Sequence, residues 1–173
     1  VSLGYFFQDG IIPGMDYERV SARLNLDHRI NDMFKFGMST ALTHSTNNWG
    51  SNSVLTEALR NLPLGRPYLE DGVTPRFNTW NDGIASNPLS EIVPGAYVDE
   101  IISSRVFLPT YLQITFSPDL TFTSTFGPDL RFSRRGEFRG AATNDNRLGP
   151  ADAETENVRE FGFTLENLVT YRK

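Results

Sequence analysis

The sequence of 173 residues contains no cysteine and only two histidines, His28 and His44. Without cysteine there are no disulfides, no thiolate nucleophile and no cysteine-ligated metal. Neither histidine has matching ligands or triad partners at a usable spacing, so we expect no metal site and no catalytic residue. The adjacent acids Asp99 and Glu100 resemble a glycosidase pair, which requires a defined separation of two carboxyl groups. The sequence cannot supply that separation, and we predict that the chain is not an enzyme.

Long apolar runs and basic clusters are also missing. No stretch approaches the 18 or so apolar residues of a membrane-spanning helix, so this type of span is excluded. The net charge is −5, and no RNA-binding aromatic motif is present. A nucleic-acid partner is therefore not expected.

The sequence does contain apolar and polar side chains that alternate with a period of two. In Tyr17–Asp27 the even positions are apolar from Val20 to Leu26, whereas the odd positions are polar from Arg19 to Asp27. A strand presents successive side chains to opposite faces, so such a segment has one apolar and one polar face. A tilted strand of about 9–11 residues crosses the hydrocarbon layer of a bilayer. This pattern predicts strands that cross a membrane.

Six segments show this alternation, and the connections between them alternate between short and long. The short connections are His28–Asp32 and Ser117–Asp119, whereas nearly sixty residues follow the third segment. This rhythm is typical of a transmembrane β-barrel with long extracellular loops. We therefore predict an all-β fold, a segment of about six antiparallel strands of a large transmembrane β-barrel. The strands are expected at Val1–Gln8, Tyr17–Asp27, Met33–Thr43, Ile102–Phe116, Leu120–Phe132 and Glu160–Tyr171.

Two regions qualify this strand pattern. Ser51–Leu62, within the long loop, has apolar residues on one helical face and is followed by Pro63, which predicts one short helix. Pro109 and Pro128 fall inside predicted strands, where each removes a ladder hydrogen bond. They indicate bulges, or a strand that leaves the sheet near Gly127. A polar loop is expected at 133–159.

Two other functions fit alternation of this kind. A soluble β-rich module that binds carbohydrate or protein also has one apolar face per strand. A passive porin is a second alternative. The strand lengths, the large apolar residues along whole faces and the loop rhythm favour the membrane barrel. Six strands cannot close such a barrel, so the remaining strands are expected outside this chain.

Several motifs resemble the SusC/RagA family of TonB-linked outer-membrane proteins, in the same order along almost the whole chain. They are Leu3–Gly14, Asp16–Arg19, Arg23–Asp27, Phe36-Gly37, Pro67-Tyr68, Asp71-Gly72, Asn87-Pro88, Asp119–Phe122, Phe126-Gly127 and Glu166–Tyr171.

This resemblance implies that residues 1–173 are part of a TonB-dependent receptor β-barrel domain in the bacterial outer membrane. The plug domain and the remaining strands would lie outside this chain. The implied function is TonB-dependent import of glycans or peptides. The implied partners are a SusD-like surface lipoprotein, TonB through the missing N-terminal region, outer-membrane lipid and the rest of the barrel.

Candidate binding residues follow from strand parity and from the loops. The lumen-facing candidates, which would contact substrate or pair across strands, are Arg19, Arg23, Asn25, Lys35, Arg105, Gln113 and Arg131. The loop aromatics that would contact ligand or the lipoprotein lid are Trp49, Tyr68, Trp80 and Tyr97.

No cofactor is expected, with one weak alternative. Oxygen ligands at Asn81-Asp82 and at Asn144-Asp145-Asn146 could hold a structural Ca²⁺ in the loops, although no EF-hand spacing is present.

Overall fold

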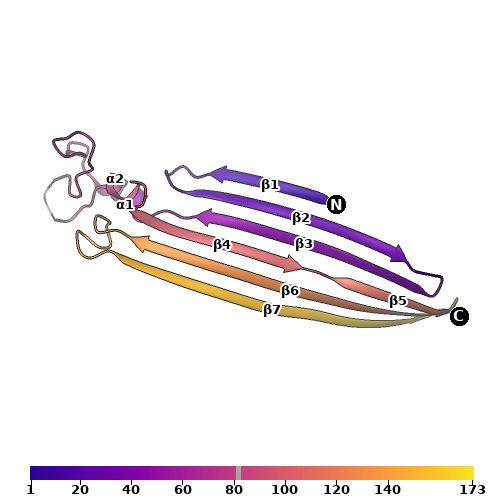
Figure 1. The fold of residues 1–173 in the computed structure, drawn as a ribbon. Helices are drawn as coiled ribbons and strands as arrows, with labels where there is room; N and C mark the ends of the chain where they lie inside the picture. The colour runs from indigo at the N-terminus through magenta and orange to yellow at the C-terminus, as the bar shows by residue number, and fades with distance from the viewer. Residues whose placement is uncertain (81–82) are drawn as a thin grey trace.

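The computed structural model describes residues 1–80 and 83–173 and contains one antiparallel sheet with two short helices at one end (Figure 1). The strands lie side by side and curve gently along their length. The element bounds are β1 Ser2–Asp9, β2 Asp16–Arg29, β3 Phe34–Asn48, α1 Ser53–Arg60, α2 Pro88–Glu91, β4 Tyr97–Phe107, β5 Thr110–Ser117, β6 Leu120–Arg139 and β7 Asp152–Tyr171.

The strands pair in chain order, as expected for a meander with antiparallel hairpins. β4 and β5 together occupy one position, between β3 and β6. One end of the sheet carries the short connections after β2 and β5, and we call it the turn end. The opposite end carries the connections after β1, β3 and β6, and we call it the loop end (Figure 1).

The predicted strand Ile102–Phe116 is divided into β4 and β5 at Leu108-Pro109. The division does not change the pairing, since Phe107 lies opposite Asp129 and Thr110 lies opposite Phe126 at one continuous offset. The Pro109 carbonyl still accepts a hydrogen bond of 2.9 Å from the Ser39 amide. The six predicted strand positions are therefore present, with one of them interrupted by proline.

Pro128 stays inside β6, opposite Phe163 of β7. Its carbonyl accepts a hydrogen bond of 3.0 Å from the Leu108 amide, on the side where β4 and β5 are divided. The amide that Pro128 lacks would point to this same side, because the N–H and C=O of one strand residue share a direction. The strand does not leave the sheet at Gly127.

The predicted polar loop 133–159 is wrong. β6 continues to Arg139 and β7 begins at Asp152, and these two strands pair without interruption along their whole length. Only residues 140–151 form the connection. The extra stretch is mostly polar on both faces, with only Phe138, Ala153 and Val158 as apolar residues, so it lacks the regular alternation that identifies a half-buried strand.

The predicted helix Ser51–Leu62 is present as α1, which is shorter at both ends. The side chain of Asn87 accepts a hydrogen bond of 3.1 Å from the Leu89 amide and thereby caps the four-residue helix α2, which the sequence reading missed. No helix of the described residues is both long enough and apolar enough to cross a membrane.

Strand register divides the sheet into two chemically different faces. The polar face carries the odd residues of β2 to β6 and the even residues of β1 and β7. The apolar face carries the opposite set, and includes Leu24, Leu42, Leu112, Phe126 and Phe163. These five side chains are each about 40–60% exposed. None of the residues that the structure describes forms a layer over the apolar face.

The molecule accordingly has almost no hydrophobic core. Ala85 is the only buried hydrophobic residue among those that the structure describes. The accessible surface is 11870 Å², whereas a compact protein of 19.5 kDa exposes about 8,500 Å². A soluble β-sandwich needs a second layer against its apolar face. A single layer of this kind needs an apolar environment or further protein against that face.

Candidate functional site

The seven lumen-facing candidates all lie on the polar face. Arg19 and Arg23 on β2 lie opposite Ser45 and Ala41 of β3, and Asn25 lies opposite Ser39. Their role in facing a lumen or binding a substrate stays a prediction. The other four candidates are distributed over β3 to β6, at Lys35, Arg105, Gln113 and Arg131.

Arg105 and Arg131 lie directly opposite each other on β4 and β6. Like charges in this position repel, but Asp129 bonds to both guanidinium groups. Its carboxylate accepts two hydrogen bonds from Arg105, at 2.8 and 2.7 Å, and one from Arg131 at 3.0 Å. Arg131 also lies 3.9 Å from a carboxylate oxygen of Glu160 on β7. Charges on three crossings of the sheet are thus linked.

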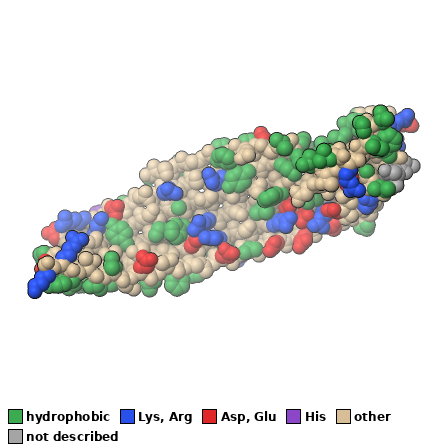
Figure 2. Space-filling view, turned by 180° about the vertical axis from the view of Figure 1, so that it is seen from behind, with side chains coloured by type: hydrophobic (Ala, Val, Ile, Leu, Met, Phe, Trp, Pro, Cys, Tyr) green, Lys and Arg blue, Asp and Glu red, His purple; other side chains and the backbone are tan. Residues whose placement is uncertain are grey.

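The same arrangement continues toward the loop end. Arg135 donates two hydrogen bonds to Asp99, at 2.8 and 2.7 Å, in the fork geometry that suits a guanidinium and a carboxylate. Arg139 donates to Glu137 at 2.9 Å and to Asp152 of β7 at 2.9 Å. We call these linked side chains the arginine row. Figure 2 shows acidic and basic side chains following one another along the sheet. The row consists of Asp99, Arg105, Asp129, Arg131, Arg135, Glu137, Arg139, Asp152 and Glu160.

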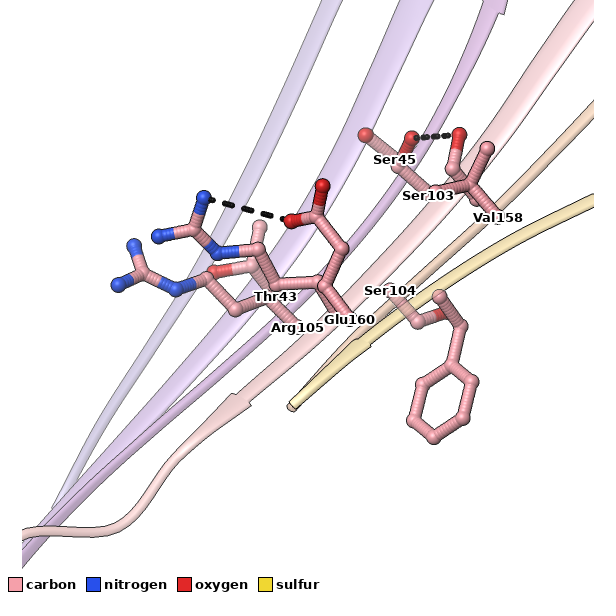
Figure 3. A pocket seen from close by; sticks show the side chains of 10 residues that line it. Thr43, Ser45, Ser103, Ser104, Arg105, Val158 and Glu160 are labelled. Atoms are coloured by element: carbon pink, nitrogen blue, oxygen red, sulfur yellow. Dashed lines mark hydrogen bonds and ion pairs between the residues drawn. The ribbon is translucent and has the colours of Figure 1, made fainter. Parts of the chain in front are cut away.

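A hollow of about 400 Å³ lies beside the arginine row. Figure 3 shows Thr43, Ser45 and Ser103 among its lining side chains, with Arg105 and Glu160 nearby. The hydroxyl of Ser103 lies 3.3 Å from that of Ser133. Hydroxyl groups, guanidinium groups and carboxylates together can donate to and accept from a polar, uncharged ligand. Arg105, Arg131 and Glu160 line the hollow, and Asp129, which bonds to both arginines, brings the sum of these four charges to zero.

A second cluster on the polar face lies near the turn end. The ring of Tyr111 covers Gly37, and its hydroxyl donates a hydrogen bond to Asp27. The ammonium group of Lys35 lies 3.8 Å from the Asp27 carboxylate and 5.5 Å from the centre of the Tyr111 ring. The candidate Lys35 is therefore held by neighbours within the wall. Gln113 lies directly opposite it across the strand pair.

The four aromatic candidates are not brought together. The indole nitrogen of Trp80 donates to the Leu62 carbonyl at 3.4 Å, and Tyr68 forms an isolated bridge with Pro75. Trp49 follows β3 and is half exposed. Tyr97 does not lie in the long loop as expected. It is the first residue of β4, and its hydroxyl donates to Glu137 at 3.0 Å.

The loops after β3 and β6 form a packed unit that we call the loop module, residues 49–80, 83–96 and 140–151. Its interior is polar. Glu57 is 1% exposed and accepts hydrogen bonds from the Ser86 amide at 3.0 Å and from Arg60 at 2.9 Å. Asn144 joins the two loops through its side chain. The side-chain nitrogen donates a hydrogen bond to the Ser53 hydroxyl at 3.5 Å, and the side-chain oxygen accepts one from the Ser86 hydroxyl at 3.0 Å. The long loops are therefore folded by hydrogen bonds and not by a hydrophobic core.

The side chains of the Asn144–Asn146 segment take part in contacts within the loop module. Asn146 donates to Arg139 and Asp152, and Asp145 lies 3.7 Å from Arg139. Asn81-Asp82, the other predicted calcium position, lies outside the described residues. Among the described residues no three acidic, histidine or cysteine side chains cluster as they would around a metal ion. The calcium site stays a prediction.

The arginine row contains residues that the sequence reading did not select. Arg135, Glu137 and Arg139 were assigned to a loop, so strand parity was not applied to them. Their spacing of two was the available signal, since it places three charged side chains on one face of any strand. Carboxylates on neighbouring strands were expected as partners of the arginines, but Asp99 and Asp129 were not named, because the strand offset that brings them to the arginines is not visible in the sequence.

Comparison with known proteins supports the TonB-dependent receptor family. The chain is 27% identical over 173 residues to TonB-dependent receptor P26 of Formosa agariphila, covering 99% of this chain and 17% of that protein. It is 29% identical to receptor P3 and 25% identical to receptor P39 of the same organism, covering 18% and 16% of them. No family profile matches the chain. The chain spans about a sixth of the length of these relatives.

The predicted fold class is confirmed. The structure is a mostly antiparallel sheet, and it is consistent with a segment of the β-barrel of a TonB-dependent receptor. The names of the three relatives denote receptors and not enzymes. Assignment to the SusC/RagA branch, the substrate and a lipoprotein partner go beyond these findings.

Proposed function

We propose that residues 1–173 form part of the β-barrel domain of a SusC/RagA-type, TonB-dependent transporter in the bacterial outer membrane. The transported substrates are glycans or peptides, and the chain has no enzymatic activity of its own. The plug domain and the remaining strands belong to other parts of the polypeptide. TonB supplies energy through such a part, and a SusD-like lipoprotein covers the loop module.

The observation that carries this proposal is the contrast between the two faces of one uncovered layer. The apolar face exposes large side chains from Leu24 to Phe163, which suits contact with lipid. The polar face carries the arginine row and the hollow beside it. A barrel wall between lipid and a polar lumen needs these two chemistries on opposite sides.

The long loops also fit a transporter mouth. The loop module lies at one end of the sheet, and only short connections occupy the other end (Figure 1). Outer-membrane barrels place their long loops outside the cell and their short turns in the periplasm. The loop module would then face the medium and any surface lipoprotein.

The decisive experiment compares uptake by cells that contain or lack the full-length protein. Cells with the protein should accumulate a labelled oligosaccharide or peptide that is too large for porins, and a protonophore should abolish this uptake. Continued uptake with the protonophore present would identify a passive porin instead. Recovery of the protein in the soluble fraction without detergent would support the soluble binding module.

A further inference from the structure

The apolar face carries two arginines that differ from those of the arginine row. Arg134 on β6 and Arg159 on β7 are exposed, and neither makes an ion pair within the described residues. The four arginines of the row, on the opposite face of β4 and β6, each lie within 4.0 Å of a carboxylate. Two arginines without an ion pair, next to the exposed phenylalanines of this face, call for a specific explanation.

Register places these two arginines next to each other. Arg159 lies directly opposite Phe132, and Arg134 lies opposite Asn157. The two arginines are therefore diagonal neighbours on the same face, with Cβ atoms about 7–8 Å apart or somewhat less. Their long side chains can converge on one ligand. Ile102 of β4 lies opposite Arg134. Glu100, two residues before Ile102 and on the same face, is the acidic residue nearest to Arg134 in the strand register.

The position of Arg134 and Arg159 along the strands, between the turn end and the loop end, is equally informative. From the turn end to Phe132 and Phe161, the apolar face of β6 and β7 is mainly aromatic and aliphatic, and both of these phenylalanines are exposed. Beyond this level the aromatic and aliphatic side chains are interrupted by Asn157, Gly136 and Thr155, and only then follow Phe138 and Ala153. Arg134 and Arg159 thus mark the boundary between the apolar band and the polar extension toward the loop end.

We propose that Arg134 and Arg159 bind the phosphate group of a lipid in the outer leaflet of the membrane. Guanidinium groups match the oxygens of phosphate with paired hydrogen bonds. The exposed rings of Phe132 and Phe161 lie where they contact the acyl chains of the same lipid, in the way that aromatic girdles flank the apolar band of a barrel. The arginine stems lie along the apolar surface while their charged groups reach the headgroup level.

This inference rests on the membrane location in the proposed function, but not on import. It assigns the lipid site to the outer surface of the wall, away from the hollow beside the arginine row. A protein that bound the lipid and failed to import would disprove transport and leave this site intact. If the protein imports substrate but the arginine variants bind lipid as tightly as the unaltered protein, the lipid site is disproved and transport is not.

The test uses the full-length protein in detergent, titrated with diphosphorylated lipid A and followed by native mass spectrometry. A basic residue at a membrane surface contributes a factor of about five in affinity. Arg134→Gln with Arg159→Gln should therefore weaken lipid A binding about 25-fold, and each single variant about fivefold. Arg134→Lys with Arg159→Lys keeps both charges and should lose less.

Arg23→Gln is the matched control, because Arg23 is an exposed arginine on the opposite, polar face. Its affinity for lipid A should equal that of the unaltered protein. Lipid A without phosphate should bind the unaltered protein as weakly as diphosphorylated lipid A binds the double variant. The proposal is overturned if the double glutamine variant keeps the full affinity for lipid A, or if Arg23→Gln loses as much affinity as the double variant. It is also overturned if inorganic phosphate displaces lipid A when it is present at the same concentration as the lipid. If the double variant does not assemble, the lipid A affinities of the two single variants test the proposal instead, and full affinity in both would overturn it.

Discussion

At the scale of single residues, the two faces of the sheet impose opposite demands on neighbouring positions. Leu24 and Asn25 are adjacent on β2, and yet Leu24 lies on the apolar face and Asn25 on the polar face. Asn25 accepts a hydrogen bond of 2.6 Å from the Ser39 hydroxyl. A change of charge at one position should therefore have a different consequence from the same change at the next.

Leu24→Arg should impair assembly of the full-length barrel far more than Asn25→Arg. A charge at the bilayer midplane on the lipid side costs about 2–4 kcal/mol, whereas a lumen position tolerates charge. The amount of folded, heat-modifiable protein in outer membranes measures the difference. Equal losses from the two variants would contradict the assignment of faces, because a shift of one residue inverts every side chain.

Gly37 is a position where the structure allows no side chain. A Cβ atom there would meet the ring of Tyr111 and would lie 2.8 Å from a carboxylate oxygen of Asp27. Gly37→Ala should therefore lower the free energy of unfolding of the full-length barrel by about 1–3 kcal/mol. Denaturant unfolding in detergent measures this change. Gly136→Ala is the control, because no atom lies within 4 Å of its Cβ position, and it should unfold no more easily than the unaltered protein.

The turn at Asp71 should depend on pH in a defined direction. The Thr74 hydroxyl and the amides of Val73 and Thr74 donate hydrogen bonds to the Asp71 carboxylate, and these bonds lower its pKa. A group with a lowered pKa stabilises the folded turn fully above its unfolded value, about 3.9 for aspartate. The contribution is then lost as the pH falls through the lower, folded pKa.

Hydrogen exchange of the peptide around residues 69–76, corrected for intrinsic rates, measures this turn. Protection should be constant from pH 7 to pH 5 and should fall only below about pH 3.9. Asp71→Ala should remove the protection at every pH. Loss of protection near neutral pH in the unaltered protein would show that another group controls the turn.

At the scale of elements, the lengths of the connections distinguish the two ends of the sheet. The β2–β3 connection is a tight turn in which the Asn31 side chain accepts hydrogen bonds from the Met33 and Phe34 amides at 2.9 and 2.8 Å. The β3–β4 connection is long and contains both helices of the loop module. The two connections leave opposite ends of β3 and should therefore lie on opposite sides of the membrane.

An epitope inserted after Leu64, which is 84% exposed, should be labelled by antibody on intact cells. The same epitope inserted at Asn31 should be labelled only after the outer membrane is permeabilised. The physical reason is that long loops face the medium and short turns face the periplasm in such barrels. Labelling in the opposite sense would reverse the orientation.

At the scale of the whole molecule, the sheet is an open wall. β1 and β7 each pair with one neighbour, so each has a free backbone edge within this chain. In hydrocarbon every unsatisfied backbone group costs several kcal/mol. The chain also lacks a core that would compensate, since its described residues bury only Ala85 among hydrophobic side chains.

Residues 1–173 expressed alone should therefore not form a stable monomeric pore. We expect aggregates or oligomers that pair through the free edges of β1 and β7. Size-exclusion chromatography in detergent and circular dichroism during unfolding measure the outcome. A monomer with ordered strands and one cooperative unfolding transition would contradict this prediction.

The sequence by itself determined the number of strand positions, their two faces and the positions of the short turns. The segment Tyr17–Asp27 shows why, since its apolar residues fall on one face of the strand and its polar residues on the other. Strand parity then placed Arg19, Arg105 and Arg131 on one face without knowledge of any contact. A period of two is a local property, and so it is visible in local sequence.

Only the tertiary structure decided which charges meet and where the strands end. Arg135 and Asp99 are far apart in the sequence and are joined because β4 pairs with β6 at one particular offset. The end of β6 and the start of β7 could not be predicted from the sequence, because both faces of these stretches are mostly polar and the alternation is lost. The loop module was equally hidden, since bonds such as Asn144 to Ser86 depend on two loops meeting in space. Pairing offset and loop packing are long-range properties, and no local pattern encodes them.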